Sequence, residues 1–154
     1  MLLLKKYVTG NIRLMIFGEQ NLKQVGLKIT QPRLKILHIF ENSKYRHLSA
    51  DDIHRILKKQ NQNVSIATIY RVLGQFESAG ILQRLNLGRD QAVYELESDD
   101  HHDHMTCIKC YQVEEFFDPM IEYRQQQAVL SKGAKLIGHS SVLYIECVKC
   151  LHKL

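Results

Sequence analysis

Four cysteines near the C-terminal end of the chain form two short pairs. Cys107 and Cys110 enclose two residues, Cys147 and Cys150 enclose two more, and no cysteine is left over. A C-x-x-C segment is a tight turn that directs two thiolates to one point, and two such turns complete a tetrahedral zinc site. Because four thiolates leave no open position for a substrate, the pattern predicts a structural Zn²⁺ ion.

Two other uses of paired cysteines fit less well. A redox pair of the thioredoxin type is expected within a βαβ unit and does not need a second pair. Disulfide bonds require export, yet the opening MLLLKK carries its charges after the apolar residues, opposite to a secretory signal. We therefore expect zinc, in a cytoplasmic protein.

A run of histidines and carboxylates from Asp100 to His104 offers ligands of another kind. In extended chain, alternate side chains point to opposite sides, so His102 and His104 would share one face, and His101 and Asp103 the other. Imidazole together with carboxylate suits Fe²⁺, Mn²⁺, Co²⁺ or Zn²⁺, and the two faces could serve two ions. Further ligands must come from elsewhere in the chain. The candidates are Glu95, Glu115, Glu122, His139 and His47.

His47 differs from the other candidates because it lies in the N-terminal half of the chain, just before a predicted helix. A metal that joined His47 to His102 and His104 would hold two domains at a fixed angle. Isolated histidines, such as His38, are expected to be ordinary solvated side chains.

Capping signals predict three helices between residues 30 and 80. These signals are Thr30 with Pro32, Ser49 with Asp52, and Ser65 with Gly80 as the stop. The apolar stripe of the third helix would consist of Ile66, Ile69, Leu73 and Phe76. Two β-type runs at 81–87 and 91–96 then predict a hairpin. Helices followed by a hairpin are the order of a winged helix-turn-helix domain.

The third helix carries side chains suited to DNA. In a helix-turn-helix protein, the first residues of the second helix reach the base edges. Small Ala67 permits close approach, whereas Thr68, Tyr70 and Arg71 can bond to bases or phosphates. Near the first helix lie further cations that could grip the DNA backbone or a narrow minor groove. They are Lys28, Arg33 and Lys35.

The C-terminal part of the chain predicts a small α/β domain with strands at 105–107, 113–116, 136–137 and 142–147 and a helix at 119–131. The expected fold class is α+β. We divide the chain into four segments. They are a flexible N-terminal extension (1–20), a winged-helix DNA-binding domain (21–96), a hinge (97–100), and a metal-binding dimerisation domain (101–154).

Composition and charge agree with two domains that have different partners. The 154 residues are 45% hydrophobic and 24% charged, with only 8 Gly and 2 Pro, which is typical of a globular protein. No apolar run approaches the roughly 20 residues that a membrane span needs. Residues 1–96 carry 15 Lys and Arg against 7 Asp and Glu, whereas 97–154 carry 6 against 9. The basic half suits a polyanion such as DNA, and the acidic half suits cations.

Two functions from other classes are less consistent with these features. A zinc enzyme of the deaminase type would need a His-x-Glu element and a water-bearing metal, and no nucleophile or general base stands apart from the candidate ligands. A zinc-ribbon adaptor that binds only proteins would leave the basic three-helix half unexplained. We therefore expect neither an enzyme nor a small-molecule substrate.

The motifs together resemble the ferric uptake regulator family, from about Leu22 to Cys150. The resemblance rests on GLKITQPRLKIL at 26–37, ATIYRVL at 67–73, HHDH at 101–104 and the two C-x-x-C pairs. It implies a homodimeric, metal-dependent repressor that binds AT-rich inverted-repeat operators of double-stranded DNA and controls iron-uptake genes. Pairing of dimers into a tetramer is left open.

The resemblance also implies three metal sites. The sensing site would be formed by His47, Glu95, His102, His104 and Glu115. A second site would be formed by His101, Asp103, Glu122 and His139, and structural zinc would bind the four cysteines. Peroxide-sensing members usually have aspartates in place of Glu95 and Glu115, which favours Fe²⁺ here, with Mn²⁺, Co²⁺ or Zn²⁺ as substitutes. Zinc- and manganese-sensing members use similar ligands and stay as alternatives.

Overall fold

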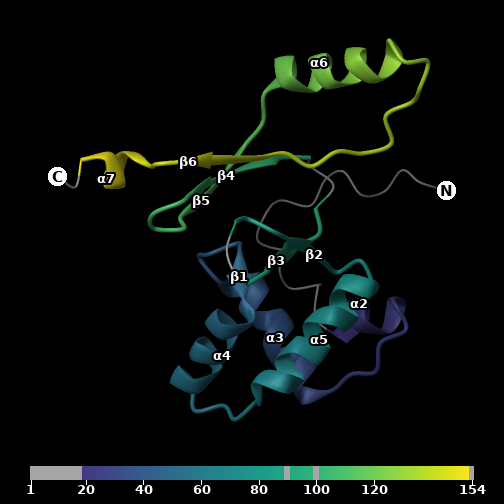
Figure 1. Cartoon of the computed structure of the whole chain (residues 1–154). Coiled ribbons are helices and arrows are strands. Elements are labelled where there is room, and N and C mark those ends of the chain that lie inside the picture. The colour runs from purple at the N-terminus through teal and green to yellow at the C-terminus, as the bar shows by residue number, and fades with distance from the viewer. Residues whose placement is uncertain (1–18, 89–90, 99–100, 153–154) are drawn as a thin grey trace. The chain divides into compact units, whose positions relative to one another are not determined.

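The structure, a computed structural model, describes residues 19–88, 91–98 and 101–152. The chain divides into two compact units (Figure 1): one contains residues up to 85 together with 91–97, and the other contains 86–90 and the residues from 98 onward. Most of the predicted N-terminal extension and half of the predicted hinge lie outside the described residues. Within the described ranges, no helix is long and apolar enough to cross a membrane.

Four helices lie in the described part of the first unit, from residue 19 onward. They are α2 (Glu19–Gln24), α3 (Gln31–Asn42), α4 (Ala50–Lys59) and α5 (Ile66–Ser78). The last three are those that the capping signals predict. Helix α2 was not predicted, because its six residues are too few to display a helical period.

Local hydrogen bonds explain where the helices begin. Ser49 Oγ accepts the backbone N–H of Asp52, whose carboxylate accepts the backbone N–H of Ser49, so both partners of a capping box are present. Ser65 Oγ accepts the backbone N–H of Thr68 at the start of α5. Thr30 stands at the N-cap of α3 in extended backbone, but its side chain makes no capping hydrogen bond. Two of the three predicted caps therefore use their side chains.

The end of α5 depends on a glycine. Gly80 has a φ of 65°, which places it in the left-handed region that favours glycine. Its N–H bonds to the carbonyl of Glu77, and the N–H of Ile81 bonds to the carbonyl of Phe76. These are the two bonds of a Schellman ending, so the chain leaves the helix directly into the next strand.

The core of the first unit lies between these helices. Ile69, Val72, Leu73 and Phe76 of α5 are at most 1% exposed and follow the i, i+3, i+4, i+7 spacing of one helical face. The prediction that Ile66 belongs to this face was wrong, because this first residue of the helix is 37% exposed. The partners of α5 in the core include Ile36, Leu37, Ile53 and Leu57.

A small antiparallel sheet completes the first unit. Its strands are β1 (Leu48–Ser49), β2 (Leu82–Leu85) and β3 (Val93–Leu96), in the order β1-β3-β2. Arg84 pairs with Tyr94 in the β2–β3 register. The predicted hairpin is present with shorter strands, and the unit has the helix and hairpin order of a winged helix.

The second unit is a three-stranded sheet with two helices. Its elements are β4 (Asp103–Cys107), β5 (Val113–Phe116), α6 (Pro119–Leu130), β6 (Val142–Ile145) and α7 (Val148–Leu151). The sheet order is β5-β4-β6, with β4 antiparallel to β5 and parallel to β6. The strand predicted at 136–137 is absent from these elements, and the short helix α7 was not predicted. The chain as a whole is mixed helix and sheet, as the sequence predicts.

Candidate metal centres and nucleic-acid interface

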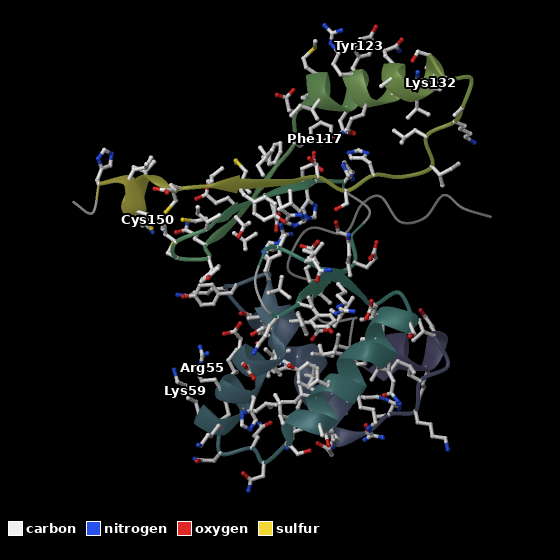
Figure 2. All side chains as sticks on the ribbon, viewed as in Figure 1. Arg55, Lys59, Phe117, Tyr123, Lys132 and Cys150 are labelled. Carbon is white, nitrogen blue, oxygen red and sulfur yellow. The ribbon has the colours of Figure 1, made fainter. Side chains whose placement is uncertain are left out.

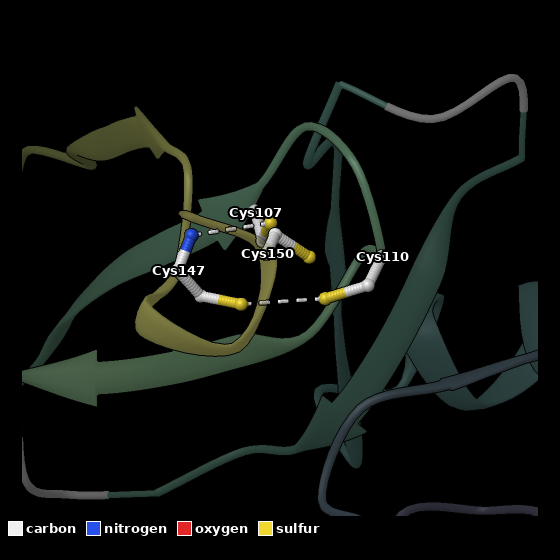
Figure 3. Close-up of side chains that lie close together, drawn as sticks. All are labelled: Cys107, Cys110, Cys147 and Cys150. Carbon is white, nitrogen blue, oxygen red and sulfur yellow. Dashed lines mark hydrogen bonds between the residues drawn. The ribbon is translucent and has the colours of Figure 1, made fainter. Parts of the chain in front are cut away.

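Three structural elements bring the four cysteines together (Figure 3). Cys107 ends β4, Cys110 closes the turn that follows, Cys147 is the N-cap of α7 and Cys150 lies within that helix. One ligand atom from each lies within 4.8 Å of the others, and the Sγ atoms of Cys110 and Cys147 are 3.6 Å apart. All four are free thiols. The folding of the two predicted turns therefore creates one cluster of four thiols.

The spacing of these thiols fits a tetrahedral ion. Zn–S bonds of about 2.3 Å at tetrahedral angles place the sulfur atoms roughly 3.8 Å apart, close to the observed Cys110–Cys147 distance. The backbone N–H of Cys147 points to Cys107 Sγ at 3.4 Å, as expected for a donor that stabilises a thiolate. The donor set and its geometry both match a closed structural zinc site.

The electrostatics of the cluster favour a cation. Hydrogen bonds from the backbone, led by that of Cys147, lower the pKa of the Cys107 thiol to about 6. The side-chain hydrogen bond with Cys147, together with burial, raises the pKa of Cys150 to about 12. Cys107 therefore ionises readily whereas Cys150 resists, and the charge of the Cys107 thiolate adds a smaller repulsion to that resistance. A divalent cation at the centre removes this repulsion and allows all four to act as thiolates.

A second cluster of ligands lies in the same unit. Its members are His101 from the segment before β4, Asp103 from the first position of β4, Glu122 from α6, and His139 from the loop before β6. Glu122 Oε1 lies 3.2 Å from Nε2 of His139 and 3.5 Å from Nε2 of His101. Asp103 Oδ1 lies 3.7 Å and 3.8 Å from the same two nitrogens.

The local structure holds this second cluster in place. Asp103 is 2% exposed, and its Oδ1 accepts the backbone N–H of Ser141 at 3.1 Å. The rings of His101 and His139 meet edge to face, with centroids 4.2 Å apart. Two nitrogen and two carboxylate ligands within 4.8 Å are a donor set that Fe²⁺, Mn²⁺, Co²⁺ or Zn²⁺ can use.

The residues of the predicted sensing site divide between the two units. In the first unit, His47 Nε2 lies 2.9 Å from Glu95 Oε2, and both side chains are below 10% exposed. His47 comes directly before β1 and Glu95 lies on β3, so the β1–β3 pairing brings them together. The first unit thus contributes one imidazole and one carboxylate, already paired.

The second unit contributes the other three residues. The rings of His102 and His104 have centroids 4.9 Å apart, as expected for alternate residues on one side of the chain. Glu115 on β5 stands directly opposite His104 in the strand register. Each unit therefore holds imidazole and carboxylate ligands of its own.

The predicted DNA contacts lie on or beside α5. Ala67, Tyr70 and Arg71 are exposed near its N-terminal end, with Tyr70 49% exposed. The Thr68 hydroxyl is 2.9 Å from Ser65 Oγ, so it also takes part in the helix cap. Lys28 is exposed in the segment before α3.

Arg33 differs from these exposed residues because its guanidinium has partners inside the unit. Its Nε and Nη2 atoms donate to Oε1 of Gln75 at 3.2 and 2.9 Å, and Nη1 donates to the backbone carbonyl of Lys28. Gln75 was missed by the sequence reasoning, because a contact over 42 residues leaves no local pattern.

Comparison with known proteins agrees with the motifs. A sequence profile of the ferric uptake regulator family matches residues 24–144. The chain belongs to this family. The Ferric uptake regulation protein of Cupriavidus metallidurans is 50% identical over 135 residues, which cover 86% of this chain and 94% of that protein.

Solved structures of other ferric uptake regulators have the same fold. The regulator from Francisella tularensis, described with iron, is 50% identical, has a TM-score of 0.79, and matches 82% of this chain and 96% of its own. That of Helicobacter pylori, described as having three functional metal binding sites, is 29% identical with a TM-score of 0.81 and coverage of 96% and 98%. Ferric uptake regulators are transcriptional regulators, so the enzyme and adaptor alternatives are set aside.

Proposed function

We propose that this regulator is a metal-dependent repressor that senses Fe²⁺ and controls iron-uptake genes. The observation that carries the proposal is the division of N/O ligands between the two units. The DNA-binding unit holds the His47–Glu95 pair, and the second unit holds His102, His104 and Glu115. The iron named for the Francisella tularensis protein supports Fe²⁺ as the sensed ion.

His47, Glu95, His102, His104 and Glu115 would hold the regulatory ion, for which Mn²⁺, Co²⁺ or Zn²⁺ are chemically suitable substitutes. When bound, a divalent cation offsets the carboxylate charges and gives the imidazoles of both units a common partner. His47 and Glu95 move with the winged helix because His47 comes directly before β1 and Glu95 lies on β3 of its sheet. Fixing these two side chains therefore restricts the orientation of α5.

The other two clusters have separate parts in the proposal. The four cysteines would hold Zn²⁺ and tie the turn after β4 to α7. This suits a unit of about 60 residues, whose own apolar core would be marginal. His101, Asp103, Glu122 and His139 would hold a second ion that fixes α6 to the sheet, independently of the first unit.

DNA contact would be made by the N-terminal end of α5. Tyr70 offers a ring for a thymine methyl group and a hydroxyl for phosphate, and Arg71 offers a cation for phosphate or guanine. Lys28 is exposed in the segment before α3, and its cation would contact the DNA backbone. We propose AT-rich operators with inverted-repeat symmetry, which match a two-fold symmetric protein.

A second copy of the chain is the proposed partner of the second unit. This unit exposes many large apolar side chains, and α6 buries none of its residues (Figure 2). The exposed set includes Phe117 (58%), Met120 (61%), Tyr123 (52%), Leu130 (54%) and Ile137 (87%). A monomer rarely leaves so much apolar surface in water, so we propose a homodimer formed through this unit. Light scattering after size exclusion would detect this dimer and, with DNA present, the pairing of dimers into a tetramer.

The direct test measures binding of a fluorescent AT-rich inverted-repeat duplex with and without Mn²⁺, which resists oxidation better than Fe²⁺. We expect a gain of about 5- to 150-fold with metal, the usual range for coupled sites. The variants His47→Ala and His104→Ala should lose this gain, whereas His152→Ala, an exposed histidine outside the three clusters, should keep it. Equal affinity with and without metal would refute the switch.

A further inference from the structure

Arg33 connects three segments of the DNA-binding unit. It lies on α3, its Nε and Nη2 atoms bond to the Gln75 side chain on α5, and Nη1 bonds to the backbone carbonyl of Lys28 before α3. Arg33 and Gln75 are both half-buried. Because the Arg33 guanidinium is bonded on two sides, its orientation is fixed. Three of its five N–H groups already donate hydrogen bonds within the unit.

The position of Gln75 on α5 connects this arrangement to the residues proposed to contact DNA. Gln75 lies four residues after Arg71 and seven after Thr68, so all three belong to one side of α5. A bond at Gln75 therefore limits rotation of the helix about its own axis. The same rotation decides where the side chains at the N-terminal end of α5 point.

The bond to Lys28 acts on a second DNA-contacting segment. The Lys28 side chain is exposed, while its carbonyl is held by Arg33. The exposed cation is therefore anchored at its backbone to the same guanidinium that holds α5. Arg33 therefore links the position of the Lys28 backbone to that of α5.

We infer that Arg33 is a positioning residue for DNA binding, with Gln75 as its partner: together they set the orientation of α5 and the place of Lys28. This inference rests on the proposed function of α5 as the DNA-reading helix. It replaces the expectation that the Arg33 charge itself grips the DNA backbone. The two roles make opposite predictions, because a positioning role needs the planar fork and Gln75, whereas a phosphate contact needs only a cation.

The test compares Arg33→Ala, Arg33→Lys and Gln75→Ala in the full-length, metal-loaded protein, with operator affinity measured over a range of salt concentrations. We expect all three to weaken binding by about 2- to 30-fold, the range for residues that act through others. Lysine should not rescue, and the neutral Gln75→Ala change should resemble the loss of the arginine. Gln24→Ala, the same type of change at an exposed position of α2, should bind as the wild type does.

One further variant, and one contrary set of results, can refute the inference. The double variant Arg33→Ala with Gln75→Ala should be no weaker than the weaker single variant, because both remove one interaction. If instead Gln75→Ala binds normally, Arg33→Lys retains affinity and Arg33→Ala lowers the salt slope by about 1, then Arg33 is a phosphate contact and the inference fails.

Failure of the proposed function would look different. In that case the wild-type protein would not distinguish the operator from a scrambled duplex. The Arg33–Gln75 pair can still be examined without DNA, by a double-mutant cycle on urea unfolding followed by circular dichroism. Strictly additive effects on unfolding would contradict the interaction itself.

Discussion

Thr106 is a buried residue whose hydroxyl has no hydrogen-bond partner among the described residues. It is 1% exposed on β4, and its Oγ1 atom is unpaired. Its neighbours in the strand register are Val113 on β5 and Tyr144 on β6. A buried hydroxyl without a partner costs roughly 1–3 kcal/mol, whereas a methyl group of the same shape does not.

We therefore expect Thr106→Val to raise the free energy of unfolding of the zinc-loaded protein by roughly 1 kcal/mol. Urea unfolding followed by circular dichroism measures this change. Thr106→Ser, which keeps the hydroxyl and loses the methyl group, should lower stability instead. A destabilised valine variant would mean that the hydroxyl is bonded to buried water.

Glu41 provides a pH-dependent prediction at the same scale. Burial raises the pKa of this carboxyl above its ordinary value of 4.5, although the nearby His38 opposes the shift. The folded state therefore favours the protonated acid. Its contribution to stability is fully present below pH 4.5 and is lost as the pH rises through the folded pKa.

The Glu41→Gln variant removes this titration. The free energy of unfolding of the variant minus that of the wild type should be larger at pH 7 than at pH 4. Urea unfolding of both proteins at both pH values measures this difference. Comparing the two proteins cancels the titration of the shared histidines. A stability difference that stays constant or shrinks as the pH rises would contradict the assignment.

At the scale of elements, sequence reasoning succeeded where local chemistry decides the structure. Ser49 and Ser65 start helices because their hydroxyls accept backbone N–H groups a few residues away, and Gly80 ends one because it adopts a positive φ. Each C-x-x-C turn brings two thiols together because its spacing sets the turn, and the pairing of β4 with β6 then joins the two turns in one cluster.

The same reasoning failed where distant contacts or short length decide. Helices α2 and α7 have six and four residues, which is too short for a periodic signal. The apolar residues at 136–137 were predicted as a strand, but they lie in the loop that brings His139 to the second cluster. The Arg33–Gln75 bond spans 42 residues and leaves no trace in the local sequence.

The capping box of α4 gives an element-scale prediction. Ser49→Ala removes the acceptor for the Asp52 N–H and the partner of the Asp52 carboxylate, whose bond to Ser49 Oγ is 2.7 Å. We expect a loss of about 1 kcal/mol in unfolding free energy. Ser78→Ala, at the exposed end of α5, should change stability by less than about 0.5 kcal/mol. Equal effects of the two substitutions would contradict the role of the cap.

At the scale of the whole molecule, the apolar surface of the second unit predicts self-association. Tyr123→Glu places a charge among the exposed side chains of α6 and should shift the protein from dimer to monomer, as measured by light scattering after size exclusion. Ala128→Glu places the same charge at another exposed position of that helix, turned away from Tyr123, and should leave the dimer intact. A wild-type protein that is monomeric at micromolar concentration would contradict the prediction.

The proposed sensing residues would make metal binding and DNA binding dependent on each other. His47 and Glu95 belong to the first unit, which we propose binds DNA, whereas His102, His104 and Glu115 belong to the second unit. If one ion uses both groups, coupling must be reciprocal: the operator must raise metal affinity by the factor by which metal raises operator affinity.

The most direct measurement is therefore the Mn²⁺ dissociation constant of the zinc-loaded protein with and without saturating operator duplex. We predict tighter Mn²⁺ binding with the operator, by the same factor as in the DNA titration, and loss of this factor in His47→Ala. An Mn²⁺ affinity that is unchanged by the operator would contradict the account.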